Sequence, residues 1–103
     1  MKVWLDDKRP APNGWRRCKT PDDAIFLLDT KKVTEISLDH DLALKGKKGY
    51  SDGATGYDVL TWIERRVAVD WSFPVPVMHV HSDNPAARDR MFAAIASIHR
   101  LAE

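Results

Sequence analysis

The feature that most constrains the fold of this chain is a repeated pattern in which a short apolar run ends in acidic or histidine side chains. The pattern occurs three times, and the residues that end the runs are, in order, Asp6-Asp7, Asp39-His40-Asp41 and His81-Ser82. In a parallel sheet the carboxyl ends of the strands lie along one edge, where open α/β folds bind their ligands. We therefore expect the three strand ends to form one acidic site that can hold a metal ion.

Segments with helical periodicity lie between these runs and predict the order β-β-α-β-α-β-α. The predicted strands cover residues 2–5, 15–19, 33–38 and 75–81, and the predicted helices cover residues 21–32, 55–69 and 85–102. Thr20 and Asn84 stand at N-caps, each followed by a proline, and Thr55-Gly56 begins the middle helix. Strands that alternate with helices are typical of a parallel sheet with helices on both faces and right-handed crossovers.

Length and composition predict one globular domain over residues 1–103. The chain is 44% hydrophobic and 30% charged, which excludes disordered and collagen-like classes. Its net charge of +1 gives no overall reason to expect nucleic-acid binding, although it leaves room for a local basic patch. The single Cys18 excludes an intrachain disulfide. Without a membrane-length apolar run or a signal-peptide pattern, we expect a cytoplasmic protein that does not enter membranes.

The acidic residues at the strand ends are the predicted metal ligands, namely Asp6, Asp7, Asp39 and Asp41. Hard oxygen ligands of this kind suit Mg²⁺ or Mn²⁺, so the expected cofactor is a divalent metal. Crowded carboxylates without a cation would repel one another. The alternative is that these acids only cap loops and are solvated. Two clusters at equivalent strand ends favour the metal site.

Two histidines at the strand ends, His40 and His81, are the candidates for proton transfer or metal ligation. Ser82 stands beside His81 as a further catalytic candidate. His79 lies deeper in its strand, and we expect it to be a buried, hydrogen-bonded structural residue that could support His81. The four tryptophans are expected in the core or at its edge rather than as platforms for bases.

Phosphate binding is the role predicted for Arg9, Ser82 and Asn84. The last helix begins next to the third strand end, and its N-terminus would attract an anion. Arg9 could clamp a phosphate, or it could instead form a salt bridge with Asp6 or Asp7. The lysines of the loop at residues 42–54 are more typical of a solvated loop than of a lid over an anionic substrate.

The layout resembles the response-regulator receiver domain, a flavodoxin-like fold. Asp6-Asp7 is similar to the acidic pair after the first receiver strand, Leu38-Asp39 to the phospho-accepting aspartate, and Ser82 to the hydroxyl residue after the fourth strand. The resemblance implies that Asp7, Asp39 and the carbonyl of Asp41 bind the metal with support from Asp6. The fifth receiver strand and its lysine have no counterpart here. The implied fold is a three-layer sandwich with four parallel strands in the order 2-1-3-4.

A closer resemblance is to the cyclic-phosphate processing receiver domain family. The similar pieces are Leu5-Asp6-Asp7-x-Arg9-Pro10, Leu38-Asp39-His40-Asp41-Leu42, Thr55-Gly56-Tyr57-Asp58 and His81-Ser82-x-Asn84-Pro85. The resemblance implies a metal-dependent phosphodiesterase that acts on cyclic nucleotides or on RNA ends with a 2′,3′-cyclic phosphate. Within that activity Asp39 could be a transient nucleophile.

Two other functions are consistent with the same residues: a binding module for cyclic nucleotides or phosphate without catalysis, and a phospho-accepting signalling domain. The missing lysine counts against signalling, and His40 with His81 favours catalysis over binding alone. Without a fifth strand, the fourth strand would be a sheet edge that must be covered or paired. Either the last helix or a second copy, in a homodimer, would do this.

Overall fold

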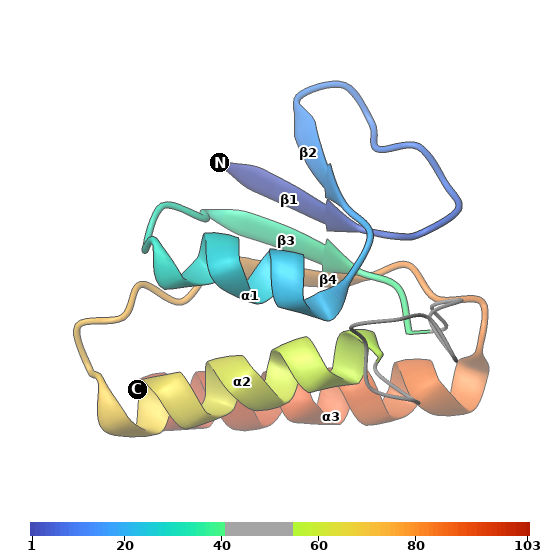
Figure 1. Cartoon of the computed structure of the whole chain (residues 1–103). Coiled ribbons are helices and arrows are strands. Elements are labelled where there is room, and N and C mark those ends of the chain that lie inside the picture. The colour runs from blue at the N-terminus through green and yellow to red at the C-terminus, as the bar shows by residue number, and fades with distance from the viewer. Residues whose placement is uncertain (41–54) are drawn as a thin grey trace.

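The computed structural model describes residues 1–40 and 55–103, in which four parallel strands form one sheet (Figure 1). The strands are β1 (Lys2–Leu5), β2 (Trp15–Cys18), β3 (Glu35–Leu38) and β4 (Val77–Val80). The helices are α1 (Pro21–Asp29), α2 (Gly56–Val69) and α3 (Pro85–Ala102). The strand order β2-β1-β3-β4 confirms the predicted order 2-1-3-4 and the receiver-like fold. None of the described helices is long and apolar enough to cross a bilayer.

The three helices begin where the sequence predicts, because each start has its own capping residue. The Thr20 side chain accepts a hydrogen bond from the backbone N–H of Asp23 at the start of α1. At the start of α2, Thr55 and Asp58 form a reciprocal capping box. Asn84 caps α3 through its side-chain oxygen. These local hydrogen bonds hold the helix starts independently of the rest of the fold.

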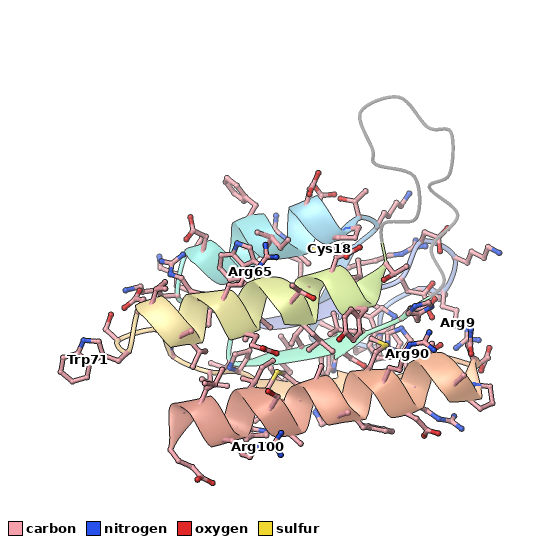
Figure 2. The ribbon with its side chains drawn as sticks, turned by 90° about the horizontal axis from the view of Figure 1, so that it is seen from below. Arg9, Cys18, Arg65, Trp71, Arg90 and Arg100 are labelled. Atoms are coloured by element: carbon pink, nitrogen blue, oxygen red, sulfur yellow. The ribbon has the colours of Figure 1, made fainter. Side chains whose placement is uncertain are left out.

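All three helices lie on one face of the sheet, with α1 packed against α2 and α2 against α3 (Figures 1 and 2). The crossovers from β2 to β3 and from β3 to β4 run in the same direction across the sheet. Two right-handed crossovers in one direction place both helices on the same face. The described residues therefore form two layers, one sheet and one layer of helices. The third layer of the predicted sandwich, helices on the other face, is not present among them.

The two faces of the sheet differ in composition. The side chains that face the helices are apolar and form the core, among them Val3, Leu5, Ile36, Leu38 and Met78. Their neighbours in sequence point to the opposite face, which carries the polar and aromatic members of each strand. No described helix covers that face, which we call the open face.

The tryptophans do not share one environment. Trp62 packs partly buried against the core, as expected, and its ring meets that of Phe73 edge to face. Trp71 is 98% exposed beyond the end of α2, so its predicted core position is wrong. Trp4 and Trp15 are half-buried on the open face. Periodicity does not separate these environments, because only the tertiary packing decides which face of a strand is covered.

A polar network closes the end of the molecule at which α2 terminates. The Asp70 carboxylate accepts hydrogen bonds from the hydroxyl and backbone N–H of Ser72 and from Arg66 Nε, and it forms an ion pair with Lys31. The Ser72 hydroxyl and these cations hold the pKa of Asp70 well below its ordinary value of 3.8. The network favours the ionised carboxylate, and therefore couples local stability to pH.

Asp70→Asn is therefore expected to lower the melting temperature at pH 7. Because the pKa of Asp70 is lower in the folded state, its contribution is fully present above the ordinary pKa and is lost as pH falls through the folded-state pKa. The difference between variant and wild type should narrow below about pH 4. Thermal melts by circular dichroism from pH 7 to pH 2 measure this, with the exposed Asp89→Asn as control. A difference that stays constant over that range would contradict the prediction.

Candidate functional site

The ends of three neighbouring strands meet at one edge of the sheet. Asp6 follows β1, Asp39 follows β3 and His81 follows β4. One ligand atom from each of these three side chains lies within 4.8 Å of the others. Hydrogen bonds between the strands fix these positions. The backbone N–H of Asp39 donates to the carbonyl oxygen of Leu5, and that of His81 donates to the carbonyl oxygen of Leu38. We call these three residues the acid–histidine cluster.

Asp6 is a buried carboxylate, only 1% exposed. Its Oδ1 accepts hydrogen bonds from the backbone N–H groups of Lys8 (2.8 Å) and Arg9 (2.9 Å). Burial by itself would raise the pKa of Asp6, but these two donors and the nearby His81 outweigh it, so the pKa is below its ordinary value. The turn after β1 thus holds a buried anion at the centre of the site.

His81 is fixed on three sides. Its Nδ1 is hydrogen-bonded to Ser37 Oγ at 2.7 Å, and its ring stacks on Trp4 at a centroid distance of 3.9 Å with an interplanar angle of 6°. Its Nε2 lies 3.3 Å from Asp6 Oδ2. Burial lowers the pKa of His81, although the Asp6 carboxylate acts in the opposite direction. The neutral imidazole is therefore the favoured form.

A divalent cation fits this donor set. Neutral His81 has two tautomers. With the proton on Nε2 the ring points N–H toward Asp6 Oδ2, and with the proton on Nδ1 it donates to Ser37 and turns the Nε2 lone pair toward the Asp6 carboxylate. In the second tautomer two acceptors face each other, which is the arrangement that a bound cation stabilises. Neither buried atom, Asp6 Oδ2 nor His81 Nε2, has a well-formed hydrogen bond among the described residues. A histidine whose second ring nitrogen is held by a hydrogen bond is the usual arrangement of a metal ligand.

A small cavity of about 150 Å³ opens beside the cluster. Its lining residues are Asp6, Lys8, Arg9, Asp39 and Asp83. Arg9 forms an ion pair with the Asp83 carboxylate and donates a hydrogen bond to the carbonyl oxygen of His81 at 3.3 Å. It therefore ties the loop after β1 to the loop after β4, and its partner is Asp83 rather than the predicted Asp6 or Asp7. The cavity therefore combines carboxylates with two cations, Lys8 and Arg9.

Ser82 and Asn84, the other predicted phosphate-binding residues, lie next to this cavity in sequence but do not line it. Ser82 is buried, and its Oγ accepts a hydrogen bond from the backbone N–H of Asn84 at 3.2 Å. Asn84 Oδ1 accepts from the backbone N–H of Ala87 at 3.1 Å. Both side chains shape the turn into α3, and their roles with substrate or in catalysis stay predictions.

The remaining predicted site residues follow the same strand ends. Asp7 and His40 are half-buried beside Asp6 and Asp39 respectively. Asp41 and the lysines of the 42–54 loop lie outside the described residues, so their predicted roles are untested. His79 is not buried as expected but lies on the open face, where its Nε2 meets Glu35 Oε2 at 2.6 Å. Its role as a hydrogen-bonded structural residue agrees with this contact.

Two residues of the site were not found from the sequence: Ser37, which holds His81 Nδ1, and Trp4, which stacks on its ring. A signal for Ser37 exists, because it is a polar residue between the apolar Ile36 and Leu38 and is in register with His79. That polar position inside a buried strand marks a hydrogen bond. For Trp4 there is no such local signal, because an aromatic residue in a strand fits either face.

A parallel sheet whose carboxyl edge carries one acid after β1 and another after β3 defines a receiver-like domain. The family model described as the cyclic-phosphate processing receiver domain matches residues 1–97. The chain belongs to this family. No curated protein and no solved structure matches it significantly.

Proposed function

We propose that this domain is a metal-dependent phosphodiesterase that opens a cyclic phosphate, either in a cyclic nucleotide or at an RNA end. The observation that supports this most directly is the acid–histidine cluster beside a cavity lined by two cations. The family match links such domains to cyclic-phosphate processing. Anionic ligands for a cation next to cationic groups for a phosphate are the two parts that such a hydrolase needs.

Asp6, Asp39 and His81 are the residues that would hold the metal, with Asp7 and the carbonyl of Asp41 as further predicted ligands. A divalent cation bound there would supply Lewis-acid polarisation of the phosphoryl group. The donor set includes an imidazole, which borderline ions accept more readily than Mg²⁺ does, so Mn²⁺ is the better candidate of the two predicted ions. Ser37 positions His81 for this role by holding its other ring nitrogen.

Arg9 and Lys8 would bind the non-bridging phosphoryl oxygens in the cavity that they line. Arg9 would exchange Asp83 for the substrate phosphate, since a guanidinium pairs with either group. In the reaction one oxygen–phosphorus bond forms to water and one ester bond of the ring breaks. The proton leaves the water and a proton reaches the departing oxygen. Because Nδ1 of His81 is held by Ser37 and its Nε2 is assigned to the metal in this proposal, His40 is the proposed residue for this proton transfer.

The test is incubation of the purified protein with 2′,3′-cyclic nucleotides, 3′,5′-cyclic nucleotides and cyclic oligonucleotides, in Mn²⁺, in Mg²⁺ and in chelator. We expect turnover of at least one substrate with metal and none with chelator. His40→Gln should lower kcat about 100-fold or more without changing the fold. Equal rates in metal and chelator would contradict the proposal.

The same assay separates the two alternatives. Tight binding without turnover under every condition would make the domain a binding module. Rapid labelling by acetyl phosphate that Asp39→Asn abolishes would instead support a phospho-accepting domain. His40→Gln distinguishes these outcomes further, because neither binding nor aspartyl phosphorylation requires a proton donor at that position.

A further inference from the structure

The open face of the sheet carries aromatic rings that begin at the acid–histidine cluster. Trp4 stacks on His81, and Trp15 meets Trp4 edge to face at a centroid distance of 5.8 Å. Trp15 also meets His79 at 6.3 Å, so its ring reaches from β2 across the face toward β4. The four rings form one continuous row, which we call the ring row. It connects the candidate site to the middle of the open face.

Positive charge accompanies the ring row. Lys2 Nζ lies 5.6 Å from the centre of the Trp15 ring, and Arg17 Nε donates a hydrogen bond to the backbone carbonyl of Asp6 at 3.1 Å. In the register of β1 with β2, Lys2 and Arg17 share the open face with Trp4 and Trp15, whereas Arg16 is level with Val3 and points to the helix side. Residues 1–19 hold six basic and two acidic side chains, whereas the whole chain has a net charge of only +1. The N-terminal segment, which supplies β1, β2 and the loop beside the candidate site, is therefore the basic part of the chain.

The composition of the open face argues against its being a covered core. Its strand positions include charged residues, among them Lys2, Arg17 and Glu35, whereas the opposite face is apolar throughout β1 and β3. The centre of a stable protein–protein interface is depleted in charge. Aromatic rings interleaved with cations are instead the arrangement that stacks bases and follows a phosphate backbone. The faces of four-stranded sheets are used in this way by RNA-binding modules.

We propose that the open face binds the bases of a single-stranded RNA whose terminal phosphate lies at the acid–histidine cluster. The inference rests on the proposed function for the position of the phosphate, and it names an RNA end, rather than a free cyclic nucleotide, as the substrate. Bases stack along the ring row, mainly against Trp15, and the backbone follows the cations of the same face, Lys2 and Arg17. The stack of Trp4 on His81 connects the ring row, where the bases bind, to the cluster where the terminal phosphate lies.

The test is fluorescence anisotropy with a labelled five-nucleotide RNA that ends in a 3′-phosphate, with and without Mn²⁺. This ligand has no cyclic bond to hydrolyse, so binding is measured apart from turnover. Trp15→Leu, which keeps an apolar side chain but removes the ring, should weaken binding about 5- to 100-fold. The matched control is Trp71→Leu, since Trp71 is 98% exposed at the end opposite Arg9 and should leave binding unchanged (Figure 2).

Circular dichroism melts of both variants verify that they fold. If Trp15→Leu unfolds the domain, Lys2→Gln is measured instead, because Lys2 is exposed on the open face beside the Trp15 ring. Its replacement should weaken RNA binding and reduce the salt dependence of that binding. Equal RNA affinity in wild type and in the folded Trp15 or Lys2 variant would overturn the inference. So would a dimer that Trp15→Leu dissociates, because the open face would then belong to a second copy. RNA binding that requires Trp15, without hydrolysis of any cyclic phosphate, would uphold this inference while the proposed function fails.

Discussion

Replacing Asp6 with asparagine is expected to abolish metal binding and turnover while the domain stays folded. The amide oxygen can still accept the hydrogen bonds from the backbone N–H groups of Lys8 and Arg9, so the turn after β1 is kept. The change removes the buried negative charge that faces His81 Nε2 at 3.3 Å. Loss of an outer-shell partner alone costs 10- to 100-fold in metal affinity, so loss of a proposed ligand should cost about 100-fold or more.

The measurement requires no substrate. A ligand at 100 times its Kd stabilises a folded protein by about 2.7 kcal/mol, which raises the melting temperature of a domain this size by about 10 °C. Wild type should show that increase as Mn²⁺ is added, and Asp6→Asn should show none. Glu103→Gln removes one negative charge at the far end of α3 and should respond as wild type does. An equal increase in Asp6→Asn would exclude Asp6 as a ligand.

Gly56→Ala is expected to destabilise the domain strongly. Gly56 is the first residue of α2, and a Cβ built on it would lie 1.9 Å from the backbone oxygen of Asp39. That neighbour is backbone and cannot rotate away. Either the start of α2 or the end of β3 must move, and overpacking of this kind costs about 3 kcal/mol. Movement of β3 would also displace Asp39 from the cluster.

The expected result is a melting temperature lowered by about 10 °C or more, together with a loss of the Mn²⁺-dependent increase. The matched control is Gly14→Ala. Gly14 has φ +85°, where alanine is strained by about 1 kcal/mol, but a Cβ there would meet no described atom within 4 Å. Gly14→Ala should lower the melting temperature less than Gly56→Ala does, and Mn²⁺ should raise its melting temperature as much as it does in wild type. A Gly56→Ala protein as stable as Gly14→Ala would contradict the close contact.

Local signals explain how much of the fold was predictable. The capping residues of all three helices act within three residues of themselves, so Thr20, Thr55 and Asn84 could be recognised without knowledge of the fold. The acidic ends of the strands were equally visible. The strand order followed only from the resemblance to receivers and is confirmed by the sheet.

The site was predictable in its residues but not in its geometry. Asp6, Asp39 and His81 were expected at one edge, and the structure brings them within 4.8 Å. The partners that set their chemistry come from distant positions: Ser37 and His81 are 44 residues apart, and Arg9 and Asp83 are 74 apart. No local pattern marks such pairs, because they depend on the register of β3 with β4 and on two loops that meet in space.

The sequence by itself determined the elements, the capping of the helices and the residue types at the strand ends, since these depend on neighbours along the chain. Only the tertiary structure decided which face of the sheet is covered. Two right-handed crossovers in one direction place α1 and α2 on one side, and α3 packs against α2 on that same side. Trp4 and Trp15 were expected in or near the core, and they lie instead on the open face because a strand presents alternate residues to opposite sides.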